Sequence, residues 1–293
     1  MITTELKKQI IVGLAKAREN FSGSDAKFAV SLGISGSQYS AIKNGQTERV
    51  LSDANWVSVA RKANVSLRSE AEWKEAKTPV FRFITAQLAA CQRGSLSTLL
   101  CDLSDIGKTF TAKHYADNNK NVVYVDCSQV KTKQRLIRLI AKEFGVGGTG
   151  RYADVYEDLV FYLKALPTPL IILDEAGDLQ HDAFLEVKAL WNATDTNCGY
   201  YMMGADGLRA KMSRAIDNKK VGYTELFSRF GRKYDKVVPV GEGSKEFLRE
   251  TAAMIIKANA KEGTDIAKVL RGTMGADDVP SLRRIYKELV KHN

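Results

Sequence analysis

Two short groups of residues have the types and spacing needed to bind a nucleoside triphosphate and cleave its terminal phosphate bond. The first is Gly107-Lys108-Thr109, which follows an apolar run and opens a predicted helix. Backbone N–H groups at such a helix start bind phosphate oxygens, and the lysine reaches the β- and γ-phosphates. The threonine hydroxyl would be a ligand of Mg²⁺. The expected nucleotide contacts in this loop are Ser104, Asp105, Ile106, Gly107, Lys108, Thr109 and Phe110.

Two carboxylates make this phosphate loop (residues 102–109) atypical. Asp102 stands where the first glycine of the usual motif is expected, and Asp105 adds a second acid. A β-carbon at the first position restricts the turn, and a carboxylate aimed at phosphate would repel it. Both side chains would therefore have to face outward for a nucleotide to bind well.

The second group is a pair of acids, Asp174 and Glu175, at the end of the apolar run 170–173. A buried strand would place Asp174 to hold Mg²⁺ through water and Glu175 to polarise the attacking water. A strand followed by a capped helix would explain the apolar run but not the paired acids. Together with Lys108, the pair predicts a site that binds ATP and Mg²⁺ and acts as an ATPase.

Arginines follow in two later segments. Arg229 and Arg232 both precede the last predicted strand, and either could reach the γ-phosphate bound to a neighbouring subunit. Arg283 opens the last predicted helix and could contact the nucleotide across a cleft. A solvated basic surface remains the alternative for both segments.

Apolar runs that alternate with helical patterns predict an α/β fold between residues 80 and 240, with a mostly parallel five-stranded sheet covered by helices on both faces. The strand candidates are Thr98–Cys101, Val122–Cys127, Leu170–Asp174, Tyr200–Gly204 and Val237–Val240. Residues 241–293 contain no convincing strand and predict a small helical lid. The polar residues 67–79 predict a linker.

Residues 1–66 read as short helices. Within them, residues 25–45 predict two helices joined at Leu32-Gly33-Ile34-Ser35, and this stretch resembles the helix-turn-helix of repressor-like DNA-binding domains. The second helix of that motif meets DNA, and its candidates here include Gln38 and Lys43. A helical protein-interaction domain remains the alternative.

The net charge of +10 is spread along the chain, which suits contact with nucleic-acid phosphates, although a merely basic protein would show it too. Lys131, Lys133 and Arg135 alternate at a loop-to-helix junction and could bind the DNA backbone without sequence preference. A second, weaker candidate loop carries Lys211, Arg214, Lys219 and Lys220. We identify no signal peptide and no apolar run long enough to span a bilayer, so we expect a cytoplasmic protein without a membrane partner.

These motifs together resemble the AAA+ ATPases over roughly residues 80–293. With the helix-turn-helix added, nearly the whole chain resembles the phage Mu transposition protein B family. The resemblance implies a slow ATPase, stimulated by DNA and by oligomerisation, that assembles as a helical filament or ring on duplex DNA in a bacterial host cell. It also implies that the protein selects the transposition target and stimulates the transposase. The polar sensor residue of the family falls on Ala205 here, with Asp206 beside it.

Two other functions remain open. A replication helicase loader would also be an AAA+ protein associated with DNA, but it would bind a hexameric helicase and prefer single strands. A nucleotide-gated transcriptional regulator would recognise one operator sequence and hydrolyse little ATP.

Overall fold

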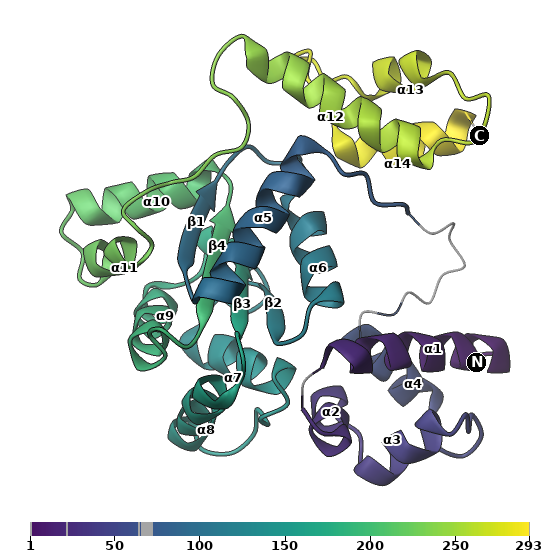
Figure 1. Cartoon of the computed structure of the whole chain (residues 1–293), viewed down its shortest axis with the longest axis vertical. Coiled ribbons are helices and arrows are strands. Elements are labelled where there is room, and N and C mark those ends of the chain that lie inside the picture. Colours follow the sequence, from purple (N-terminus) through teal and green to yellow (C-terminus); the bar gives the residue numbers. More distant parts are fainter. Residues whose placement is uncertain (1, 22, 64, 66–72, 293) are drawn as a thin grey trace.

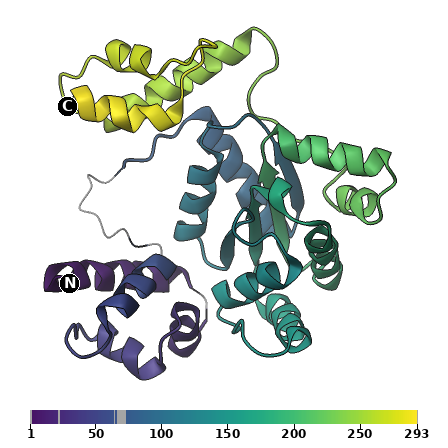
Figure 2. The same ribbon diagram turned by 180° about the vertical axis from the view of Figure 1, so that it is seen from behind.

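The computed structural model describes residues 2–21, 23–63, 65 and 73–292. Its elements form an N-terminal group of helices, a central sheet with helices on both faces, and a C-terminal group of helices (Figure 1). Seen from either side, the two outer groups lie on the same side of the sheet, beyond α6 (Lys108–Asn118) (Figures 1 and 2). In the described residues no helix is long and apolar enough to cross a membrane.

The central sheet is parallel, with the strand order β1-β4-β3-β2. Its described strands are β1 (Ser97–Cys101), β2 (Val122–Asp126), β3 (Leu170–Asp174) and β4 (Gly199–Gly204). Every residue of β3 and β4 is buried, because helices cover both faces of the sheet. The α/β fold predicted for this region is therefore confirmed.

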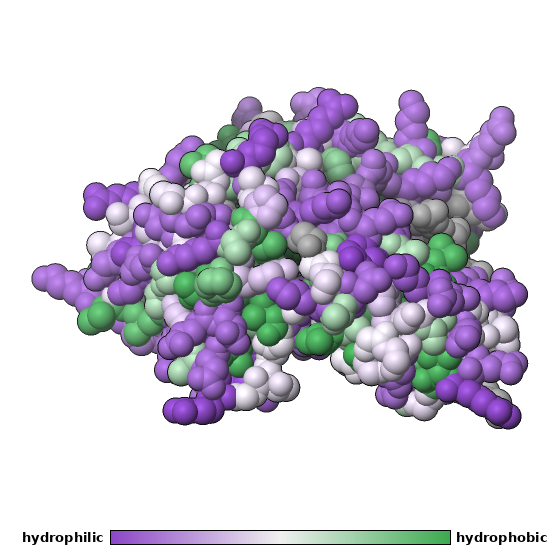
Figure 3. Space-filling model, turned by 60° about the horizontal axis from the view of Figure 1, so that its bottom comes forward, coloured by the Kyte–Doolittle hydropathy of each residue, from purple (hydrophilic) through white to green (hydrophobic). Residues whose placement is uncertain are grey.

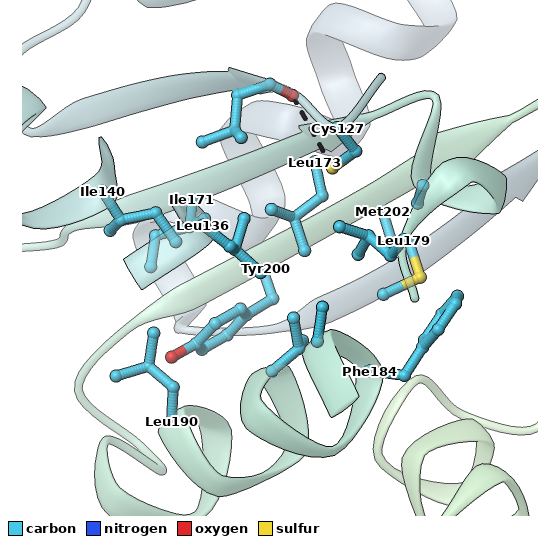
Figure 4. Packing of buried hydrophobic residues seen from close by; sticks show 14 of the residues in the cluster. Cys127, Leu136, Ile140, Ile171, Leu173, Leu179, Phe184, Leu190, Tyr200 and Met202 are labelled. Carbon is cyan, nitrogen blue, oxygen red and sulfur yellow. Dashed lines mark hydrogen bonds between the residues drawn. The ribbon is translucent and has the colours of Figure 1, made fainter. Parts of the chain in front are cut away.

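Neighbouring residues of a strand point to opposite faces and enter different cores. Ile172 packs with α5 (Pro79–Gly94) and α6, whereas Ile171 packs on the other face. That second face is covered by α7 (Lys133–Glu143), α8 (Tyr152–Ala165), α9 (His181–Ala193), α10 (Asp206–Asp217) and α11 (Tyr223–Arg229). Figure 4 shows its centre, where residues of α7 and α9 pack on Ile171, Leu173 and Tyr200.

The predicted fifth strand, Val237–Val240, is wrong. The segment that precedes the lid pairs with β1 only at a single parallel bridge, between Leu100 and Asp235. Beyond that bridge, the N–H groups of Val237 and Val238 donate to the side chain of Asp102 and not to the backbone of β1. The sheet of the described residues accordingly has four strands.

The N-terminal helices are α1 (Thr4–Asn20), α2 (Asp25–Leu32), α3 (Gly36–Lys43) and α4 (Asp53–Lys62). They have a core of their own in which Trp56 is fully buried. Gly33 ends α2 with a φ of 69°, a left-handed conformation that glycine adopts without strain. Figure 3 views the molecule from the side of these helices and shows a surface that is mostly hydrophilic with scattered apolar residues. Two helices joined by a turn are thus present where predicted, and DNA binding by them stays a prediction.

The C-terminal lid consists of α12 (Gly243–Asn259), α13 (Ile266–Thr273) and α14 (Leu282–His292) around a small apolar core. Residues 73–78, which fall in the predicted linker, run along this lid. The Lys74 N–H donates to Asn259 Oδ1 at 2.8 Å, and Asn259 Nδ2 donates back to the Lys74 carbonyl at 3.1 Å. This half of the linker is therefore fastened to the lid.

Candidate functional site

The phosphate loop leaves the carboxyl end of β1 and turns into α6. Gly107 stands at the turn with a φ of 97°, and no described side chain caps the start of the helix. The first N–H groups of an α-helix have no partner within it, so those of α6 are left for a ligand. The positive end of the helix favours an anion at the same place.

Lys108 lies within this loop, as the sequence predicted. Its side chain is buried, and its ammonium donates to the carbonyls of Asp102, at 3.0 Å, and of Leu103. Burial lowers the pKa of Lys108, while the nearby Asp102 and Asp174 raise it. The ammonium is thus held at the phosphate loop, where a phosphate oxygen would be a better-matched partner than a carbonyl.

Asp102 does not aim its carboxylate at the phosphate position. The side chain is 1% exposed and accepts hydrogen bonds from three backbone N–H groups. Leu103 donates to Oδ1 at 2.7 Å, while Val237 and Val238 donate to Oδ2 at 2.6 and 2.9 Å. The acid in the place of the usual glycine therefore ties the loop to the chain that leads into the lid.

Asp105 is also turned toward the lid. It has a φ of 59°, and its Oδ2 accepts a hydrogen bond of 2.7 Å from the hydroxyl of Ser281. Its Oδ1 lies 3.7 Å from Nε of Arg283, whose side chain is 83% exposed, so this ion pair is weak. Arg283 nevertheless stands beside the phosphate loop, where the sequence placed it.

The predicted metal-binding pair comes together at the edge of the sheet. The hydroxyl of Thr109, in the first turn of α6, donates to Oδ2 of Asp174 at 2.7 Å. Asp174 is buried at the end of β3, and its Oδ1 accepts from the Glu175 N–H at 2.8 Å. A hydroxyl and a carboxylate supply the oxygen ligands that Mg²⁺ prefers, so these residues fit the ion.

Tyr124 is a member of this cluster that the sequence analysis missed. From β2 its hydroxyl donates to Oδ2 of Asp174 at 2.8 Å, so this oxygen accepts both from the tyrosine and from Thr109. Burial and the charge of Asp174 raise the pKa of Tyr124, which keeps the phenol protonated and able to donate. Only the pairing of β2 with β3 brings Tyr124 to Asp174, and the sequence alone does not show which strands pair.

Glu175 is the first residue beyond β3 and is exposed at the carboxyl edge of the sheet. Partial loss of solvent around its carboxylate raises the pKa of Glu175, as does the neighbouring charge of Asp174, whereas Lys108 lowers it. A carboxylate with a raised pKa is a better acceptor for a proton from water.

The next turn, η1 (Ala176–Asp178), is held by Lys211, whose ammonium donates to the Gly177 carbonyl at 2.7 Å. Lys211, predicted to contact DNA, is thus engaged in supporting the acidic turn.

An apolar pocket of about 400 Å³ adjoins the phosphate loop and extends to the lid. The rings of Trp73 and Tyr286 lie 6.1 Å apart within it. Its other apolar walls include Ile106, Phe110, Ile255 and Leu282. Aromatic and apolar walls beside a phosphate-binding loop suit the base of a nucleotide. Phe110 was among the predicted contacts, but Trp73 fell in the predicted linker and was missed.

The structure does not bring Arg229 to this pocket. Its Nε donates to Oδ1 of Asn192 at 2.7 Å, and its guanidinium lies 5.3 Å from the ring of Trp191. The guanidinium therefore lies on the surface of α9. Arg232 is exposed, and neither arginine lines the pocket. Action of either one on a neighbouring subunit stays a prediction.

Ala205 stands where the family resemblance would place a polar sensor residue, and its side chain is apolar. Ala205 precedes α10 as its N-cap, and the neighbouring Asp206 lies 3.8 Å from Nζ of Lys236.

Gln38 and Lys43, the DNA contacts predicted in α3, both have partners within the N-terminal helices. Gln38 forms a capping box with Ser35 at the start of α3, with hydrogen bonds of 2.9 and 3.2 Å. Lys43 donates to Asp25 at 2.9 Å. Both are therefore partly engaged in holding α3 in place.

The other predicted DNA contacts lie at the start of α7, in a separate part of the molecule from α3 (Figure 1). Lys131 pairs with Asp178 at 3.4 Å, next to the acidic turn. Lys133 and Arg135 form no ion pair with any described residue. These two cations are available to a ligand.

Comparison with known proteins gives a match to the part of the chain that carries the phosphate loop and the acidic pair. Residues 91–212 match the family model described as an AAA domain. The match supports an AAA+ ATPase family. It includes the phosphate loop, the acidic pair and all four described strands. The comparison with curated proteins gives no match.

Proposed function

We propose that the protein binds ATP and Mg²⁺ between the phosphate loop, the acidic end of β3 and the lid, and hydrolyses the ATP slowly. The observation that carries this proposal is the 2.7 Å hydrogen bond between Thr109 and Asp174, which unites the two motifs in one site. The base of ATP would enter the apolar pocket, and the phosphates would lie on the N–H groups at the start of α6.

The residues of the chain then have separate tasks. Lys108 would exchange its carbonyl partners for the β- and γ-phosphate oxygens, and Arg283 would approach the same phosphates from the lid. Glu175 would orient the attacking water and take its proton. Mg²⁺, when bound, would neutralise charge on the phosphates. The apolar Ala205 offers no side-chain donor at the sensor position, which is one reason to expect slow turnover.

ATP binding is the first test of this proposal. We expect Lys108→Ala to lose most of the ATP affinity, because the loop carries no second lysine. A matched control is Lys120→Ala, which removes an exposed lysine beyond the far end of α6. Equal affinity of both variants for ATP would contradict the proposal.

We further propose that ATP binding drives assembly of the chain on duplex DNA, as expected for a protein that selects a transposition target and stimulates a transposase. The net charge of +10 favours contact with the DNA backbone, as do Lys133 and Arg135, which form no ion pair with any described residue. The internal partners of Gln38 and Lys43 favour binding without base recognition over an operator-specific regulator. A cytoplasmic location in a bacterial host belongs to the same proposal.

Electron microscopy with ATP, Mg²⁺ and duplex DNA tests this second step. Filaments or rings should form on unrelated DNA sequences, and Lys108→Ala should not form them. If ATP leaves the wild-type protein monomeric in the presence of DNA, assembly is excluded. Preferential capture of a hexameric helicase and of single strands would instead indicate a helicase loader.

A further inference from the structure

A second cavity, of about 620 Å³, lies between the N-terminal helices and the sheet, away from the phosphate loop. Its walls come from α1, α2 and α4 on one side and from α6, β2 and α7 on the other. Contacts across this boundary hold the two parts together. Asn20 donates to the carbonyl of Asp117, and the ammonium of Lys27 lies 3.8 Å from the ring of Tyr162.

The cavity carries an excess of positive charge. Its basic side chains are Lys16, Arg61, Lys62, Lys113 and Lys142, and its acidic ones are Asp117 and Glu143. Lys16, Arg61 and Lys142 form no ion pair with any residue that the structure describes. Among the described residues that line the cavity, five cations face two acids, and solvent or an anion must balance the surplus.

Lys62 lies in the same cavity wall as Arg61 and across from Lys142, and both of these charges act on it. Burial lowers the pKa of Lys62, and the charges of Lys142 and Arg61 lower it further. The ammonium of Lys62 donates to the Leu32 carbonyl at the end of α2, so it is fixed at the wall. Glu143 offsets only part of this charge, and its own pKa is raised by burial. A multiply charged anion would relieve the repulsion that Arg61 and Lys142 exert on Lys62.

We propose that this cavity binds a phosphate-bearing anion. The phosphate would lie between Arg61 and Lys62 of α4 and Lys142 of α7, and would thereby join the N-terminal helices to the ATPase part of the chain. The remainder of the ligand would contact the ring of Phe21 and the apolar surface of β2. Two sources share this chemistry, a free nucleotide and the backbone of bound DNA.

The test uses inorganic tripolyphosphate and the full chain with Lys108→Ala, so that the phosphate loop does not compete for the probe. Calorimetry should detect binding, and the probe should raise Tm. Adding Lys62→Gln and Lys142→Gln should weaken binding by about ten-fold or more, because two charged hydrogen bonds are lost. The matched control is Lys120→Gln with Lys164→Gln, two exposed lysines outside the cavity, for which binding should stay unchanged.

A pair of charge-preserving variants protects the test against misfolding. Lys62→Arg with Lys142→Arg should retain binding, and circular dichroism should show that all variants fold. Displacement of the probe by AMP or by a short DNA duplex would each support the site and would identify its natural source. Lack of probe binding, or equal weakening by the cavity variant and its control, would overturn the proposal. ATP binding by the wild-type chain is measured separately, so a failure here leaves the ATPase proposal untouched.

Discussion

The hydroxyl of Ser281, at the start of the last lid helix, donates a hydrogen bond of 2.7 Å to the carboxylate of Asp105 in the phosphate loop. This contact gives a role to an acid that would otherwise repel a nucleotide. It joins the lid directly to the loop, and Asp105 also lines the apolar pocket. The two acids that make the phosphate loop atypical thus have structural partners: Asp105 contacts the lid, and Asp102 binds the chain that leads into it.

Asp105→Ala should loosen the lid without unfolding the protein. Trp73 lies between loop and lid, beside Tyr286, so its fluorescence should become more accessible to acrylamide. Asp195→Ala, which removes an exposed carboxylate after α9, should leave quenching unchanged. Unchanged quenching in Asp105→Ala would show that the lid does not depend on this contact.

Asp102→Gly, which restores the usual motif, should destabilise the protein. The change leaves the N–H groups of Val237 and Val238 without their acceptor, at a cost of about 1–3 kcal/mol. Urea unfolding should show a lower midpoint for the glycine variant. Asp102→Asn should lose less stability, because its amide oxygen still accepts hydrogen bonds from these N–H groups. A glycine variant as stable as the wild type would contradict this role.

Tyr124→Phe should weaken ATP binding only when Mg²⁺ is present. The hydroxyl of Tyr124 positions Asp174, and its loss should cost about 1 kcal/mol, or roughly five-fold in affinity. Without Mg²⁺ the affinity should equal that of the wild type. Tyr162→Phe removes a hydroxyl outside the site and is the control. An equal loss with and without Mg²⁺ would mean that Tyr124 does not act through the metal site.

Glu175→Gln should preserve ATP binding and slow hydrolysis by about 10²-fold or more, because the amide cannot take a proton from water. The pKa of Glu175 is raised, so the wild-type rate should fall on acidification at a higher pH than an ordinary glutamate would give. This acidic limb should disappear in the residual activity of Glu175→Gln. Normal hydrolysis by the variant would remove Glu175 from the mechanism.

Much of the sheet could be predicted from the sequence, because buried parallel strands are continuous apolar runs. The expected strand Tyr200–Gly204, for example, differs from β4 only in that β4 begins one residue earlier, at Gly199. Val237–Val240 shows the same apolar character, but its N–H groups are taken by Asp102, and no local pattern reveals this distant acceptor.

The residues of the site divide in the same way. The sequence predicted one site for Lys108, Thr109 and the acidic pair, because each motif combines residue types and spacing that phosphate and Mg²⁺ binding require. Tyr124 and Trp73 act through contacts between segments far apart in the chain, and a polar linker gives no sign that one of its residues lines a pocket. The orientation of Arg229 toward Asn192 is likewise a property of packing.

The most direct test of the central claim is the binding of ATP with Mg²⁺, measured by calorimetry on the wild type and on Thr109→Ala. The hydroxyl of Thr109 is shared between the phosphate loop and Asp174, so its removal should abolish the Mg²⁺-dependent part of the affinity. Binding by the wild type that depends on Mg²⁺, and its loss in the variant, is the result we predict. An affinity for ATP that neither Mg²⁺ nor the Thr109 substitution alters would contradict the assignment of this site.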